Sequence, residues 1–206
     1  NGAAAGVSGT VLADDTAPRG ASTNRDAVGD FAFKAASVIV TSGGIGGNFE
    51  MVRKAWPTAR LGPAPKEMIA GVPAHVDGRM IAISEQAGGQ VINGDRMWHY
   101  TEGVKNWDPI WPAHGIRILP GPSSMWFDAT GKRFAPPALP GFDSMGTLRS
   151  ILATGYDYSW FVLTQKIIKK EFALSGSEQN PDFTSASWRE VIRQRILSGK
   201  RATGPV

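Results

Sequence analysis

The sequence feature that most constrains the fold is a short apolar run that ends in a cluster of glycines. Residues 36–41 are apolar and rich in β-branched side chains, a composition that predicts a strand buried on both faces. Four glycines then fall within residues 43–47, and Asn48 stands where it can cap a helix that starts at Phe49. Because glycine has no Cβ atom, a ligand or another chain segment can approach this turn closely.

A buried strand, a glycine turn and a helix N-terminus form the layout that receives phosphate or dinucleotide groups in open α/β sheets. Residues 42–48 do not match GxGxxG, and they are not a P-loop, because no Gly-Lys-Ser/Thr follows them. The local sequence therefore leaves two interpretations open: a turn that contacts a ligand, or a tight strand-to-helix connection without one.

Composition excludes several classes of protein. The net charge of +4 is scattered rather than gathered into a basic stripe, which argues against nucleic acid binding. The chain has no cysteine, so disulfides, thiolate metal sites and cysteine nucleophiles are excluded, and a reducing, cytoplasmic location is expected. The 3 histidines are too scattered to predict a metal site. No apolar run approaches the ~20 residues that a membrane span needs.

Periodicity predicts a mixture of strands and helices. Residues 6–13 predict a strand, and residues 31–34 would pair back on it as a hairpin. Apolar residues at helical spacing predict a helix over residues 79–87, and a short strand is expected over residues 91–93. Further strands are predicted at residues 116–119, 124–128 and 158–163, and further helices at residues 145–153, 164–172 and 185–197.

Three motifs carry a resemblance to a known family. Residues 36–44 read ASVIVTSGG, residues 75–78 read HVDG, and residues 124–134 read SMWFDATGKRF. In this order they resemble a strand and turn against FAD, a helix start, and a later strand and turn. These belong to the flavoprotein dehydrogenases and reductases of the fumarate reductase, succinate dehydrogenase and 3-ketosteroid Δ1-dehydrogenase superfamily. The similarity is nearer to the ketosteroid branch.

The resemblance implies an α+β fragment of a discontinuous FAD-binding α/β domain followed by a capping domain. Residues 1–93 would be the partial FAD-binding domain, and residues 94–206 the capping or substrate domain of mixed strands and helices. The GxGxxG unit that holds the ADP half of FAD in relatives is absent from this sequence. The chain alone is therefore expected to be inactive and not to retain FAD. Its apolar surface would pair with the remainder of its own FAD domain or self-associate.

The same resemblance implies which residues meet the cofactor. The glycine turn would contact FAD through Thr41, Ser42, Gly43 and Gly44. The start of the helix predicted at residues 79–87 would contact it through Asp77 and Gly78. A second interpretation applies to Asp77, because its predicted role as the N-cap of the helix at Arg79 explains the residue without a cofactor. A tight turn without FAD contact remains the alternative for the glycines.

In relatives the aromatic segment around His99 and Tyr100 lies where the cap meets the flavin. A neutral histidine or a tyrosine can bind a ketone oxygen or move a proton, so both are candidate catalytic residues. The alternative is that both side chains only pack. Glu102 is near enough in sequence to tune either one. Four tryptophans are candidates to wall an apolar pocket or to fill a core: Trp98, Trp107, Trp111 and Trp126.

Departures from the family pattern bear on the substrate. His99 stands where the dicarboxylate-binding relatives have Gln, and Thr101 where they have His. The catalytic arginine of fumarate reductases falls near Asp143 or Ser144, and neither is basic. Because a dicarboxylate needs fixed cations, we expect a hydrophobic, ketone-like and perhaps steroid-like substrate, with hydride transfer between FAD and a carbon next to the ketone. The alternative function is a stand-alone α+β binding module with a Trp-rich ligand or partner surface.

Overall fold

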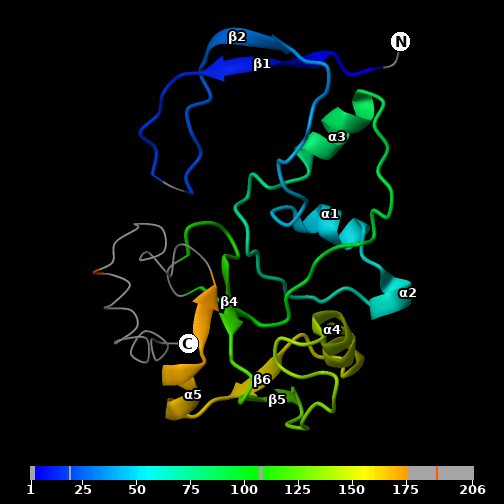
Figure 1. Cartoon of the computed structure of the whole chain (residues 1–206), viewed down its shortest axis with the longest axis vertical. Coiled ribbons are helices and arrows are strands. Elements are labelled where there is room, and N and C mark those ends of the chain that lie inside the picture. The colour runs from blue at the N-terminus through cyan, green and yellow to red at the C-terminus, as the bar shows by residue number, and fades with distance from the viewer. Residues whose placement is uncertain (1–2, 19, 107–108, 176–188, 190–206) are drawn as a thin grey trace.

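The computed structural model describes residues 3–18, 20–106, 109–175 and 189. Within this part the chain forms a mixed α+β arrangement of two two-stranded sheets, one three-stranded sheet and short helices (Figure 1). The helix predicted at residues 185–197 lies outside the described residues, apart from residue 189.

The N-terminal hairpin is confirmed. Strands β1 (Gly6–Leu12) and β2 (Ala27–Lys34) pair antiparallel with Gly9 opposite Phe31, so β2 starts earlier than the sequence predicted. The hairpin lies at one end of the molecule, away from the other sheets (Figure 1). Large apolar side chains on it stay exposed, among them Val7, Val11, Val28 and Phe33.

The strand predicted at residues 36–41 does not form, and neither does the short strand at residues 91–93. The side chain of Ile39 is 85% exposed, so the apolar run is not buried on either face. A strand needs a neighbour that satisfies its backbone N–H and C=O groups, and no strand in the described part of the chain pairs with this run. The prediction of a buried strand at residues 36–41 is therefore wrong for the described part of the chain, because the neighbouring strands that it requires are not among the described elements.

The helix after the glycine turn is confirmed as α1 (Phe49–Lys54). Its N-cap is Asn48, whose side-chain oxygen accepts a hydrogen bond from the Met51 N–H at 3.1 Å. A short helix α2 (Thr58–Leu61) follows. Helix α3 (Arg79–Gln86) ends before Gly88 as predicted, because Gly88 has a φ of 91°, which glycine adopts readily.

A small apolar core joins the first and second halves of the chain. Its buried residues are Val52, Trp56 and Leu61, from α1, its C-terminal end and α2. Helix α4 (Ser144–Ala153) packs against them through Met145, Leu148 and Leu152. Residues on both sides of position 93 therefore share one apolar cluster.

The second half is built from two antiparallel sheets. Strands β3 (Gly103–Lys105), β4 (Gly115–Leu119) and β7 (Ala173–Ser175) form a sheet in that order. Strands β5 (Met125–Asp128) and β6 (Ser159–Val162) pair separately, and helix α5 (Gln165–Lys170) precedes β7 (Figure 1). The strands predicted at residues 116–119, 124–128 and 158–163, and the helices at residues 145–153 and 164–172, are confirmed to within a few residues.

Candidate cofactor site

The glycine turn packs directly against the segment that leads into α3. The Gly47 N–H donates to the Val76 carbonyl at 2.8 Å, and the Asn48 side-chain amide donates to the Asp77 carbonyl at 3.4 Å. A Cβ atom on Gly47 would lie 2.6 Å from the Pro73 carbonyl oxygen, so glycine is required there for close approach. Asn48 and Asp77 are 29 residues apart in sequence. The glycine turn and the segment before α3 thus form one hydrogen-bonded backbone unit.

One side of this unit is closed and the other is open. Gly43 has a φ of 84°, and a Cβ atom on it would lie 2.9 Å from the Val76 side chain. A Cβ atom on Gly44 would meet nothing within 4 Å. Thr41, Ser42 and both glycines are exposed, and the backbone hydrogen bonds of the described part of the chain leave their N–H groups unused. Free N–H groups of successive turn residues suit the oxygens of an anionic or dinucleotide ligand.

Gly78 belongs to the closed side. It is buried, has a φ of 81°, and is itself the N-cap residue of α3. A Cβ atom on it would lie 2.8 Å from Ile45 and 2.9 Å from the Met51 sulfur. The residue is therefore fixed by the packing of the glycine turn and α1 against the start of α3.

The prediction that Asp77 is the N-cap of this helix is wrong by one residue. The cap position belongs to Gly78 because its left-handed backbone turns the chain into α3. Asp77 still serves the helix start, since its carboxylate accepts a hydrogen bond from the Arg79 N–H at 3.0 Å and pairs with the Arg79 guanidinium at 2.7 Å. The Arg79 backbone N–H is the main cause that holds the pKa of Asp77 below its usual range, with a smaller contribution from the guanidinium.

His99 lies against the apolar core. Its ring centroid is 4.9 Å from that of Trp56, and burial lowers the pKa of its imidazole. Its Nε2 atom is buried and has no hydrogen-bond partner. A neutral imidazole with a free buried nitrogen is chemically able to bind or transfer one proton.

Tyr100 faces a different environment from His99. Its side chain is 51% exposed, and the Arg117 guanidinium carbon lies 3.9 Å above the centre of its ring. Trp98, which is 83% exposed, lies on the same outward side with its ring centroid 6.0 Å from that of Tyr100. The two candidate catalytic residues therefore do not share one environment, although they are neighbours in sequence.

Glu102 is a residue whose setting sequence reasoning missed. Its side chain is 1% exposed, and neither carboxylate oxygen has a hydrogen-bond partner. It bonds to neither His99 nor Tyr100, so the expected tuning of those residues through a direct hydrogen bond is not seen. The burial of Glu102 is linked to strand β3, which begins at the next residue. This strand has only 3 residues, so periodicity does not predict it.

The tryptophans do not line a common surface. Trp111 is buried and stacks on His114 with ring centroids 3.6 Å apart, while its Nε1 donates to the Ala70 carbonyl at 3.2 Å. Trp126 is buried in another place, stacked on Phe161. Packing, the alternative interpretation, therefore holds for these two, and Trp107 lies outside the described residues.

The third motif is a tightly bonded turn. The Asp128 carboxylate accepts hydrogen bonds from the Thr130 hydroxyl at 2.7 Å, the Thr130 N–H at 2.9 Å and the Lys132 N–H at 3.0 Å. These bonds, the Thr130 hydroxyl first, lower the pKa of Asp128. The turn itself therefore explains Asp128 and Thr130 of this motif.

A glycine turn joined to a helix start, with free backbone N–H groups on its open side, is the type of site that dinucleotide-binding proteins use. The chain belongs to the FAD binding domain family, whose pattern it matches over residues 1–198. FAD is the cofactor of this family. Gly44 suits such a group, since no protein atom lies within 4 Å of the position of a Cβ on it.

Curated relatives carry names that agree with the family. The chain is 60% identical over 204 residues to a KsdD-like steroid dehydrogenase of Mycobacterium tuberculosis, a match that covers 99% of this chain and 36% of that protein. It is 62% identical over 201 residues to a KsdD-like steroid dehydrogenase of Mycolicibacterium smegmatis, covering 98% of this chain and 36% of that protein. The chain therefore spans about a third of the length of these relatives. No solved structure matches it.

The predicted resemblance to the flavoprotein superfamily, on its ketosteroid dehydrogenase side, is confirmed by these comparisons. Among the described residues, none of the helices has the length and apolar character needed to cross a membrane.

Proposed function

We propose that the longer protein containing this sequence is an FAD-dependent dehydrogenase that acts on a CH–CH group next to a ketone. The observation that supports this most directly is the backbone unit formed by the glycine turn and the start of α3, in a chain of the FAD binding domain family. The site combines close backbone approach with unused N–H groups, which is what a bound dinucleotide requires.

In this proposal Thr41, Ser42, Gly43 and Gly44 hold FAD through the open side of the turn. Asp77 and Gly78 complete the proposed FAD contact at the start of α3. The Asp77 carboxylate is engaged with the Arg79 N–H, and the Cα of Gly78 packs close to Ile45 and Met51. Bound FAD supplies the hydride acceptor or donor at its flavin ring. The contribution of the chain is to place that ring and to keep the turn rigid.

The proposed substrate is an apolar ketone of steroid-like size. The two relatives described above are named steroid dehydrogenases. The catalytic arginine of fumarate reductases would fall near Asp143. This residue is instead the N-cap of α4, and its carboxylate accepts a hydrogen bond from the Gly146 N–H at 2.8 Å. The nearby Arg149 donates to the Arg60 carbonyl at 3.0 Å, so it is engaged with the protein. The absence of a free cation at these two positions, 143 and 149, favours a neutral substrate over fumarate or succinate.

His99 and Tyr100 remain the proposed catalytic residues. The lowered pKa of His99 keeps its imidazole neutral at pH 7, so it can accept the second proton of the reaction. Tyr100 is exposed and bears a phenol that can donate a hydrogen bond to a ketone oxygen.

The proposed organisation places a partial FAD-binding domain at residues 1–93 and a capping domain at residues 94–206, in a cytoplasmic protein. The apolar side chains exposed on the β1–β2 hairpin would then be covered by the remainder of the FAD domain. The chain by itself would be inactive, would not retain FAD and would self-associate through these side chains.

The test is the absorption spectrum of the protein expressed from the uninterrupted reading frame. A flavin band near ~450 nm that bleaches with a ketosteroid donor supports the proposal. Gly44→Ala adds a methyl group where only the cofactor would meet it, so we expect FAD to dissociate about tenfold more readily. Gly29→Ala is the matched control, because a Cβ atom there also meets nothing within 4 Å, and it should leave FAD binding unchanged.

A colourless full-length protein would contradict the flavin proposal. That result would favour the alternative function, a stand-alone α+β binding module, which one structural observation supports. Tyr156, Tyr158 and Trp160 form an exposed row of aromatic rings with centroids 5.7 and 5.5 Å apart. Such a row can stack against a sugar or a partner protein. A module of this kind would bind its ligand without flavin.

A further inference from the structure

The side chain of Asn48 makes a hydrogen bond with each of two separate segments. Its Oδ1 atom accepts from the Met51 N–H at 3.1 Å, and this bond caps α1. Its Nδ2 atom donates to the Asp77 carbonyl at 3.4 Å, two residues before α3 begins at Arg79. One carboxamide therefore joins the end of the glycine turn to the segment that leads into α3.

Capping alone does not explain why residue 48 is an asparagine. An N-cap needs only an acceptor, and serine and aspartate cap helices about as well as asparagine. The bond to the Asp77 carbonyl also needs a donor at the far side of the same side chain. An ionised aspartate has no donor, and the single oxygen of a serine cannot occupy the places of both the oxygen and the nitrogen of Asn48. Of the common capping residues, only asparagine supplies both bonds.

The rest of the contact between these segments consists of backbone groups and of glycines in close packing. The Gly47 N–H donates to the Val76 carbonyl at 2.8 Å. A Cβ atom on Gly46 would lie 2.9 Å from the Val72 side chain. Within the part of the chain that the structure describes, Asn48 supplies the one side-chain hydrogen bond that crosses this contact.

We propose that Asn48 is a positioning residue for FAD, which acts by keeping the glycine turn and the start of α3 at a fixed spacing. This inference rests on the proposed function, in which FAD contacts Gly43 and Gly44 on one segment and Asp77 and Gly78 on the other. Asn48 and Asp77 are 29 residues apart in sequence, so the spacing of the two segments depends on contacts such as this one. Without the amide link a smaller fraction of molecules has the binding geometry, and the apparent affinity for FAD falls by that fraction.

The experiment uses the full-length protein, from which FAD is removed and to which it is then added back in a titration followed by flavin fluorescence. Asn48→Ser keeps an acceptor for the α1 cap and removes the donor to Asp77. We expect FAD to bind about threefold to tenfold more weakly, the range for one hydrogen bond. The unfolding free energy of the FAD-free protein should stay close to that of the native protein. Saturating FAD should restore the native flavin spectrum, because only the population of the binding geometry is changed.

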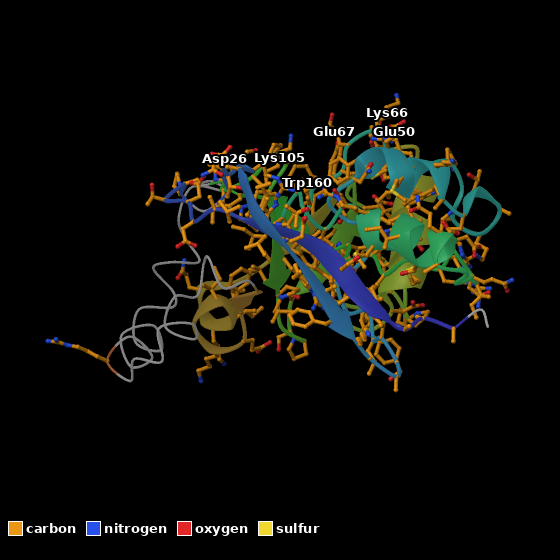
Figure 2. The ribbon with its side chains drawn as sticks, turned by 90° about the horizontal axis from the view of Figure 1, so that it is seen from above. Asp26, Glu50, Lys66, Glu67, Lys105 and Trp160 are labelled. Atoms are coloured by element: carbon orange, nitrogen blue, oxygen red, sulfur yellow. The ribbon has the colours of Figure 1, made fainter. Side chains whose placement is uncertain are left out.

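Asn48→Asp is a stronger variant of the same kind. It also keeps the α1 cap, but it sets a second acceptor against the Asp77 carbonyl, so we expect FAD to bind more than about tenfold more weakly. The variant adds a negative charge, for which Glu50 provides the control. Glu50 lies in the first turn of α1 and at the outer edge of the molecule in Figure 2. Asn48→Asp combined with Glu50→Gln has the native net charge and should bind FAD as weakly as Asn48→Asp alone.

Asn24→Ser is the matched control for the substitution itself. The Asn24 side-chain oxygen accepts from the Asp26 N–H at 2.8 Å in the loop between β1 and β2, so it is also an asparagine that bonds a nearby backbone N–H. It makes no bond to the glycine turn or to the segment before α3 within the described residues. Its replacement should leave the affinity for FAD unchanged.

An unchanged affinity for FAD in Asn48→Ser would overturn the proposal. Weaker FAD binding together with an equally large fall in the unfolding free energy would also overturn it, because the residue would then act on the whole structure. If Asn48→Ser does not fold, Asn48→Asp decides the question, and failure of both to fold would contradict a positioning role. A native protein that binds no FAD contradicts the proposed function itself. A native protein that binds FAD, with variants that bind it equally well, contradicts only the role of Asn48.

Discussion

The glycine turn and the polar segment at residues 99–102 differ in how their polar groups are satisfied. On its closed side the glycine turn is tied to the start of α3 by backbone hydrogen bonds and by glycines that leave no free space. In the polar segment, three of four successive residues carry buried polar atoms without partners. The first region is held in place by contacts within this chain, whereas the described residues leave these polar atoms of the second region without a partner.

The glycine turn can be recognised from the sequence, whereas the unusual character of residues 99–102 is visible only in the structure. A turn that closes on itself needs glycine at particular backbone positions, so its sequence shows the constraint directly. Residues 99–102 are ordinary polar and aromatic residues in sequence, and only the burial of their polar atoms without partners marks them as unusual. The two regions meet at Trp56, because Ile45 of the glycine turn packs on the core cluster that contains it and His99 contacts its ring.

Removing Trp56 is expected to have the largest effect and to disrupt both regions. The side chain is 8% exposed, and its Nε1 donates to the Gly62 carbonyl at 2.9 Å. Trp56→Ala should lower the free energy of unfolding by about 3–5 kcal/mol, as for other large aromatic residues in cores. It should also raise the pKa of His99 toward its ordinary value, because the burial that lowers it is lost. Denaturant unfolding and NMR titration of the histidine measure the two effects.

Trp56→Phe is the matched control, since it keeps an aromatic ring against His99 and loses only the indole hydrogen bond. An unfolding free energy that falls equally in both variants would show that the ring itself does not support the core.

Gly78→Ala should destabilise the glycine turn alone. The new Cβ atom would lie 2.8 Å from Ile45 and 2.9 Å from the Met51 sulfur, at a φ of 81°. Strain and overpacking together are expected to cost about 2–4 kcal/mol of unfolding free energy. Gly88→Ala separates the two causes, because Gly88 has a φ of 91° but a Cβ atom there meets nothing within 4 Å. Its cost should be about 1–2 kcal/mol. Equal losses in the two variants would contradict a packing role for Gly78.

Local rules predicted much of the fold. The hairpin, the Asn48 cap, α3 and α4 follow from patterns confined to a few neighbouring residues, so composition and spacing were enough. The strand at residues 36–41 failed for a non-local reason, since a buried strand depends on neighbours that the local pattern does not reveal. The N-cap of α3 was predicted at Asp77 and lies at Gly78 for a similar, non-local reason. The backbone conformation of Gly78 goes with its close packing against Ile45 and Met51, which the local sequence does not reveal.

The candidate site was predictable to a similar extent. The family resemblance implied that the Gly43–Gly44 turn and the segment of Asp77 and Gly78 both contact FAD. The structure joins the two segments through the hydrogen bonds of Gly47 and Asn48, and their contact with FAD stays a prediction. The environment of Glu102 was not predictable, because it depends on the β3–β4 register that turns its side chain onto the face of Ile116. Proximity in sequence suggested contact with His99 or Tyr100, whereas strand alternation decides which side chains share a face.

The smallest expected effect is a pH dependence of stability that originates in His99. Burial lowers the pKa of this imidazole in the folded protein, so the unfolded chain binds a proton more readily below pH ~6.5. The free energy of unfolding should therefore fall as the pH is lowered from ~6.5 toward the folded pKa, and then level off. His99→Gln removes the titrating group and should flatten this part of the profile, measured as denaturant midpoints between pH 7.5 and 5. His75→Gln is the control, because His75 is exposed, and it should keep the slope of the native protein. If the slope persists in His99→Gln, another group causes it, and the polar segment is less isolated from solvent than its unpartnered Nε2 atom indicates.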